Sequence, residues 1–72
     1  MKAVVRYYDT RNTYRVKTIT VDKNEPNYIV REFIKLTHQP VWVRITRIKC
    51  GRVEYQWFDT AKAAYWLVMG GR

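Results

Sequence analysis

The alternation of apolar and polar residues predicts four β-strands in two hairpins. Residues 2–8 (KAVVRYY) and 14–21 (YRVKTITV) are rich in β-branched and aromatic residues, and the polar run DTRNT between them is typical of a hairpin loop. Residues 41–49 and 52–58 alternate in the same way on either side of Cys50-Gly51. Glycine there allows the positive φ that a tight turn needs.

Two further segments carry the signals of α-helices. In residues 22–36 (DKNEPNYIVREFIKL), Asn24 is a capping residue, Glu25 and Pro26 suit a first turn, and apolar residues recur at helical spacing: Ile29, Val30, Phe33, Ile34 and Leu36. Residues 59–71 (DTAKAAYWLVMGG) begin with the capping residues Asp59 and Thr60 and carry Gly70 as a stop signal.

These elements predict one domain of the α+β class over residues 1–72. We expect a four-stranded antiparallel sheet with two helices on one face, in the order ββαββα. The order strand, strand, helix occurs twice, so the chain is either a duplicated ββα unit or a simple architecture reached by convergence.

Side-chain alternation then assigns the faces of the sheet. With an even-length loop in the second hairpin, Val41, Val43, Ile45 and Phe58 point to the helices, with a pair of Arg47 and Glu54 near the turn. The same assumption in the first hairpin sends Ala3, Val5, Tyr7, Tyr14 and Val16 inward. The face away from the helices would present Arg6, Tyr8, Arg15, Lys17, Trp42, Arg44, Tyr55 and Trp57. An odd-length loop would flip either assignment.

The charge of the chain favours a polyanionic partner. Lys and Arg number 14 against 6 Asp and Glu, for a formal net charge of +8, and both halves share the excess. A basic domain of this kind fits nucleic acid first and an anionic membrane surface second. Basic residues neutralise phosphates, and Trp and Tyr rings stack on unpaired bases. We therefore expect the outward residues to bind DNA or RNA, although burial of Trp42 and Trp57 with Arg44 between them is the structural alternative.

Residues 42–68, WVRITRIKCGRVEYQWFDTAKAAYWLV, resemble the strand, turn, strand and helix unit of AP2-type domains and of phage integrase arm-binding domains. These families lay a small sheet in the DNA major groove. The resemblance implies that Trp42, Arg44 and Trp57 would read DNA. The families have three strands before their helix, so the first hairpin would have to supply the third here.

The segment from Thr60 to Met69 has Lys62 as its only charged residue. A helix that is apolar nearly all round is either covered on both sides by its own domain or used at an interface. We expect Tyr65, Trp66 or Met69 to lie in a homodimer interface or in a docking site for another protein.

Few residues suit catalysis, a cofactor or a metal. Cys50 is the single cysteine, and its place beside Gly51 predicts a plain turn residue. His38 is the single histidine and is expected on a surface loop. We predict no cofactor, no small-molecule substrate and no enzymatic activity. The lone cysteine and the lack of an apolar leader or membrane span predict a cytoplasmic protein, or a nuclear one in a eukaryote.

Two other functions stay open at this stage. A compact protein-binding module, such as a phage-encoded inhibitor of a host enzyme, would use Trp, Tyr and Arg as a hot spot in the same way. A metal-independent ribonuclease toxin would use His38 with Arg44, and ranks below binding.

Overall fold

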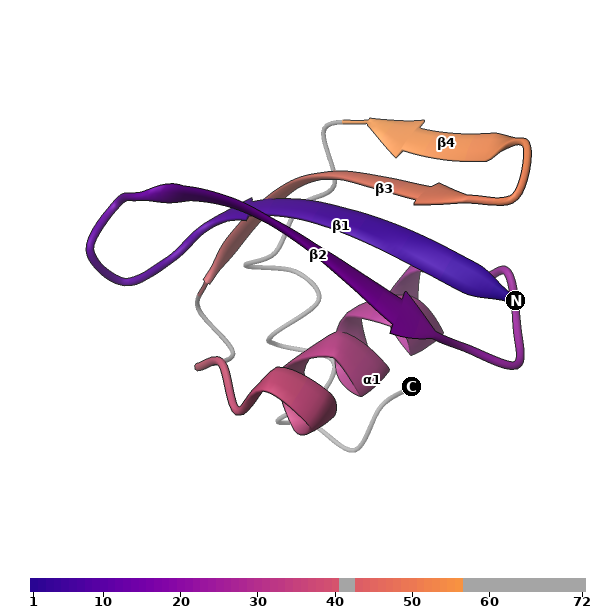
Figure 1. Ribbon diagram of the computed structural model, residues 1–72, viewed down its shortest axis with the longest axis horizontal. Helices are drawn as coiled ribbons and strands as arrows, with labels where there is room; N and C mark the ends of the chain where they lie inside the picture. The colour runs from indigo at the N-terminus through magenta and orange to yellow at the C-terminus, as the bar shows by residue number, and fades with distance from the viewer. Residues whose placement is uncertain (41–42, 57–72) are drawn as a thin grey trace.

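Among the residues that the structure describes, four antiparallel strands form one sheet and a single helix packs against one of its faces (Figure 1). The computed structural model describes residues 1–40 and 43–56. Within them lie β1 (Lys2–Tyr8), β2 (Tyr14–Thr20), α1 (Pro26–Thr37), β3 (Arg44–Cys50) and β4 (Val53–Gln56). The strand order across the sheet is β2-β1-β3-β4.

The predicted order ββαββα with two helices on one face was wrong, and the order found in residues 1–40 and 43–56 is ββαββ with one helix, α1. The broad α+β class holds. The second predicted helix falls on residues 59–70, outside the residues that the structure describes. That prediction rested on capping residues and apolar content, and the segment has no polar stripe to specify a packing face. By contrast, α1 has one buried side, formed by Ile29, Val30 and Phe33, which packs against the sheet in the described core.

The connection from β2 to β3 explains why the helix lies where it does. Both strands run antiparallel to β1, so they run parallel to each other with β1 between them. Parallel strands cannot be joined by a tight turn and need a long crossover, usually a helix. The segment that contains α1 provides this crossover and places the helix across one face.

The core lies between α1 and the sheet. Every second side chain of β1 points toward the helix and is buried: Ala3, Val5 and Tyr7. Phe33 of α1 belongs to the same core and is fully buried. The rings of Tyr7 and Phe33 pack edge to face with centroids 4.7 Å apart. The other fully or nearly buried residues are Ile19, Val21, Ile29, Val30, Val43, Ile45, Ile48 and Cys50. Within the residues described, no helix has the length and apolar character needed to cross a membrane.

The first hairpin closes through residues 9–13, an odd-length loop. The Asp9 carboxylate accepts hydrogen bonds from the backbone N–H groups of Arg11 and Thr13, both at 2.9 Å, and Asn12 takes a left-handed conformation with φ 59°. Asn tolerates that conformation better than most residues. Because the loop is odd, β2 is flipped relative to the prediction. Tyr14 and Val16 point away from the helix, while Arg15 and Lys17 point to the helix side.

An acid-dependent ion pair holds this loop to β2. The Arg15 Nε atom donates to Asp9 Oδ2 at 2.7 Å. Arg15, followed by the N–H groups of Thr13 and Arg11, lowers the pKa of the Asp9 carboxyl below its ordinary value. A depressed carboxyl pKa contributes stability above the unfolded-state value of about 4, and that stability is lost as pH falls through the folded-state pKa.

We therefore predict a pH-dependent effect for Asp9→Asn. The amide oxygen still accepts from the loop N–H groups, but the charge that pairs with Arg15 is gone. The melting temperature of the variant should fall below that of the natural chain near pH 6, and the gap should narrow as the pH is lowered toward 2 and Asp9 takes up a proton. Thermal unfolding followed by circular dichroism measures both. A gap of equal size at the two pH values would contradict this role of the charge.

The second hairpin closes through an even-length turn and departs from simple alternation at a bulge in β3. Gly51, with φ 60°, takes the first central position of a two-residue turn with Arg52, as a type II′ turn requires. Cys50 was predicted in the turn, but it is the last residue of β3 and is fully buried. A β-bulge at Thr46 shifts the register between β1 and β3, so that Ile45 and Ile48 are both buried.

The two ends of α1 differ in detail from the prediction. Pro26 begins the helix, where its missing N–H costs nothing. Glu25, rather than Asn24, stands at the N-cap, and it makes no side-chain capping bond. His38 ends the helix in a left-handed conformation with φ 56° and is exposed. Its predicted place on a surface loop is therefore confirmed.

Candidate nucleic-acid interface

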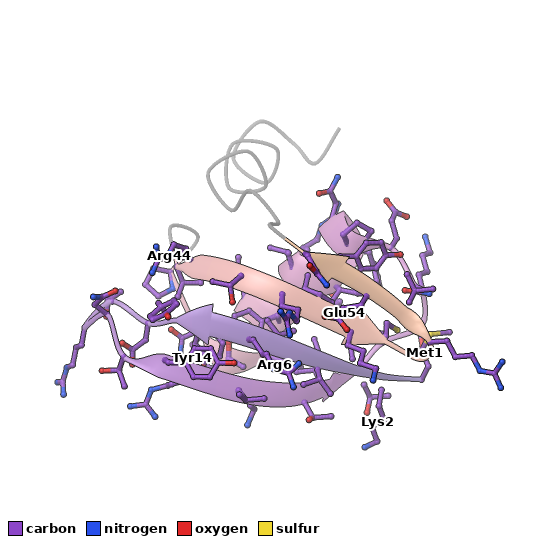
Figure 2. All side chains as sticks on the ribbon, turned by 90° about the horizontal axis from the view of Figure 1, so that it is seen from above. Met1, Lys2, Arg6, Tyr14, Arg44 and Glu54 are labelled. Carbon is purple, nitrogen blue, oxygen red and sulfur yellow. The ribbon has the colours of Figure 1, made fainter. Side chains whose placement is uncertain are left out.

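The sheet face opposite α1, here called the open face, is built by the side chains that alternate with the core residues. No helix or strand among the described residues covers it, and Figure 2 looks onto it from above. Its members come from all four strands: Lys2, Val4, Arg6, Tyr8, Tyr14, Val16, Thr18, Thr20, Arg44, Thr46, Arg47, Lys49, Glu54 and Gln56.

A depression of about 210 Å³ lies on the open face. Each strand contributes to its lining: Tyr14 from β2, Arg6 from β1, Thr46 and Arg47 from β3, and Gln56 from β4. The volume is below the roughly 300–1,000 Å³ of pockets that enclose drug-sized ligands. Its lining combines two guanidinium groups, a hydroxyl, an amide and an aromatic ring. This combination suits a small anionic and planar group.

Two arginines on the lining lie directly opposite each other. Arg6 on β1 and Arg47 on β3 are register partners. Like charges in directly opposed positions destabilise a sheet. Arg47 is balanced by Glu54, with Nε and Oε1 3.0 Å apart, whereas Arg6 has no ion-pair partner among the described residues. The sheet therefore carries an uncompensated positive charge at the depression.

An aromatic cluster borders the same site. The rings of Tyr8 and Tyr14 pack edge to face with centroids 5.5 Å apart, and the Arg44 guanidinium carbon lies 4.3 Å from the centre of the Tyr8 ring. This cation–π contact holds Arg44 over Tyr8. Tyr14 remains 50% exposed, and Figure 2 shows it close to Arg6, on the side toward the loop of the first hairpin.

The open face is more positive than the rest of the described chain. Its charged residues are Lys2, Arg6, Arg44, Arg47 and Lys49 against Glu54 alone, which leaves five minus one, or +4. The other described residues carry seven cations and four carboxylates, or +3, spread over the helix, the loops and the helix side of β2. The open face therefore carries more than half of the net positive charge of the described residues.

Three of the predicted site residues come together there. Arg6 lines the depression, and Tyr8 and Arg44 form the adjacent stacked pair. Their shared outward direction was predicted from alternation. For Arg44, the bulge at Thr46 is what keeps it on the open face while Ile48 turns inward.

Three other predicted residues lie on the helix side of the sheet, which corrects their assigned face. Arg15 and Lys17 are flipped by the odd-length first loop, and Arg15 is paired with Asp9. Tyr55 is opposite the buried Ile48, and its hydroxyl donates to the backbone oxygen of Asn24 at 3.0 Å. That hydrogen bond ties β4 to the segment before α1, so Tyr55 has a structural contact there.

Five predicted residues lie outside the described part of the chain. Trp42 and Trp57 were expected on the basic face, and Tyr65, Trp66 and Met69 were expected at a protein interface. The proposed reading of DNA by the two tryptophans and the proposed homodimer contact therefore stay predictions.

The lining also contains four residues that were not among the predicted site residues: Tyr14, Thr46, Arg47 and Gln56. Tyr14 was assigned inward because an even loop was assumed. The pairing of Arg47 with Glu54 is confirmed, but on the open face. The five residues DTRNT between the two predicted strands are an odd number, and this was the local signal for the true face of β2.

No protein-family model matches the chain, and comparisons with curated proteins and with solved structures find no similar protein. In residues 1–40 and 43–56 no group of three or more His, Cys, Asp and Glu side chains is placed to hold a metal ion.

Proposed function

We propose that this protein binds nucleic acid, DNA or RNA, through the open face of its sheet. The observation that carries the proposal is the depression that Arg6, Tyr14, Thr46, Arg47 and Gln56 form across four strands. It combines unneutralised positive charge with an exposed aromatic ring. Positive charge binds the phosphates of a nucleic acid, and an aromatic ring stacks on its bases.

The arrangement divides the work among the side chains. Arg6 and Arg47 offer hydrogen-bond donors and charge to a phosphate, and guanidinium groups match phosphate oxygens in geometry. Tyr14 offers a ring at the rim of the depression. Thr46 donates its hydroxyl proton to the Arg6 backbone oxygen at 3.2 Å, so toward a ligand it acts as an acceptor. Gln56 adds an amide that both donates and accepts.

Neighbouring cations extend the favourable surface beyond the depression. Arg44 lies at one end of β3 and Lys49 near the other, and Lys2 lies at the start of β1. A polyanion that crosses the depression would pass within reach of cations on either side. A single small anion would use the central pair alone.

The experiment that tests the proposal is an NMR titration of the ¹⁵N-labelled chain with short oligonucleotides. We expect shifts at the amides of the open-face residues and none along α1. Shifts confined to the helix, or none with any oligonucleotide, would contradict the proposal.

A further inference from the structure

The two tyrosines of the open face differ in how much of each ring is free of contacts. Tyr8 is in contact with neighbours on two sides, because Arg44 lies over its ring and Tyr14 packs against it. Tyr14 has the single aromatic contact with Tyr8, is 50% exposed and lines the depression. Tyr14 is therefore the ring among the described open-face residues that is free to stack on a planar group from outside.

The availability of a ring face discriminates between single and double strands. In a duplex the flat faces of the bases are covered by the neighbouring base pairs, and a protein reaches base edges and phosphates only. In a single strand a base can leave its neighbours and stack on an aromatic side chain, which contributes about 1–3 kcal/mol per base. The exposed Tyr14 ring is useful to a single strand and of little use to a duplex.

The shape of the site leads to the same choice. A sheet that reads a major groove must project its side chains into a channel about 12 Å wide. Here the polar side chains line a depression of about 210 Å³. A group that protrudes from the ligand can enter this depression, whereas major-groove binding would need side chains that protrude from the protein. Splayed-out bases and the phosphates beside them are protruding groups of single strands.

The opposed arginines supply the matching contact for the phosphate. Arg6 and Arg47 are register partners, and Glu54 offsets one of the two charges. An anion bound between them would relieve the repulsion that the empty sheet carries. Tyr14 and the two arginines line the same depression, so a base and its own phosphate can occupy both contacts at once.

We propose that the open face binds single-stranded nucleic acid, with one unpaired base stacked on Tyr14 and an adjacent phosphate between Arg6 and Arg47. This inference rests on the proposed function and specifies its ligand class. Ring stacking tolerates any base, so the binding is weakly dependent on sequence.

The test compares three probes: a fluorescein-labelled DNA strand of about twelve nucleotides of mixed sequence, the RNA strand of the same sequence, and the DNA annealed to its complement. Fluorescence anisotropy at fixed salt gives each dissociation constant. Tyr14→Leu removes the ring, Tyr14→Phe keeps it, and Leu36→Ala truncates an exposed apolar side chain of α1, outside the open face. Circular dichroism confirms that each variant is folded.

We expect at least one of the single-stranded probes to bind more tightly than the duplex. Tyr14→Leu should weaken that binding about 5- to 150-fold, while Tyr14→Phe and Leu36→Ala stay within about threefold of the natural chain. A duplex that binds at least as tightly as both single strands would overturn the inference and leave the proposed function standing. Equal effects of Tyr14→Leu and Leu36→Ala would overturn the role of Tyr14. Failure of all three probes to bind would overturn the proposed function itself.

Discussion

Charge reversal at Arg6 should weaken nucleic-acid binding about 10- to 100-fold at roughly 0.1 M salt. Arg6 lines the depression without an ion-pair partner among the described residues, so its charge is available to a phosphate. A charge-assisted hydrogen bond contributes about 1.5–3 kcal/mol, and each 1.4 kcal/mol is a factor of ten in affinity. The slope of log K against log salt should also become shallower by about 0.7 for a single strand, the share of one phosphate.

The same substitution should leave the fold intact or stabilise it. A glutamate at position 6 would stand opposite Arg47, which replaces a repulsive cross-strand pair with an attractive one. Such pairs contribute about 0.2–1 kcal/mol. Urea denaturation should therefore show an unchanged or higher midpoint for Arg6→Glu. A gain in stability together with a loss of affinity would mark Arg6 as a residue kept for binding.

Arg31→Glu is the matched control for this prediction. Arg31 is exposed on α1, on the far side of the protein from the open face, and its substitution lowers the net charge by the same two units. Lys35 stands four residues later, a favourable spacing for a glutamate at position 31. Binding should fall far less than for Arg6→Glu. Equal losses for the two variants would show that the overall charge, and not the open face, governs affinity.

Truncation of Phe33 is expected to have the largest effect on stability. Phe33 is fully buried and packs its ring against Tyr7 at the centre of the interface between α1 and the sheet. Phe→Ala substitutions in cores cost about 3–5 kcal/mol. A folded chain of 72 residues has roughly 4–11 kcal/mol in total, at about 0.05–0.15 kcal/mol per residue. Phe33→Ala should therefore remove between about a third and all of the stability.

Leu36→Ala is the control within the same helix. Leu36 is 57% exposed, although the helical spacing of apolar residues grouped it with Phe33. Its truncation should change the free energy of unfolding by less than about 0.5 kcal/mol, as is usual for surface positions. Urea denaturation followed by circular dichroism measures both variants. A Leu36→Ala cost similar to that of Phe33→Ala would contradict the described core.

The strands and α1 were predictable because their signals are local. Alternation of β-branched residues marks β1 and β2, and the spacing of Ile29, Val30 and Phe33 marks the buried stripe of the helix. Pro26 and the polar run before it fix where α1 begins. Each of these features depends on a few neighbouring residues, which a sequence displays directly.

The faces of β2 follow from the odd number of residues in the first loop, whereas the prediction assumed an even-length loop. Residues 9–13 form an odd-length loop because Asp9 binds two backbone N–H groups and Asn12 adopts a left-handed conformation. Since side chains alternate with a period of two, one residue more or less sends the whole strand to the other face. This is why Tyr14, and not Arg15 or Lys17, belongs to the candidate site.

The bulge at Thr46 changes which residues of β3 point toward the helix, as the odd-length loop does for β2. Val43 and Ile45 are buried on one side of it, and Ile48 and Cys50 on the other, so the apolar phase shifts between Ile45 and Ile48. Continued alternation from Ile45 would place Ile48 outward and Tyr55 beside it. The sequence displays this change in the spacing of apolar residues. Whether it marks a bulge depends on how β3 pairs with β1, about 40 residues away.

The titration of the ¹⁵N-labelled chain with a short single strand tests the central claim most directly. Binding at the open face predicts progressive shifts for the amides of Arg6, Tyr14, Arg47 and Gln56, with a dissociation constant that weakens as salt is raised. The amides of Arg31 and Lys35 on α1 should stay in place. Shifts centred on α1 and independent of salt, with the open-face amides unchanged, would contradict the claim.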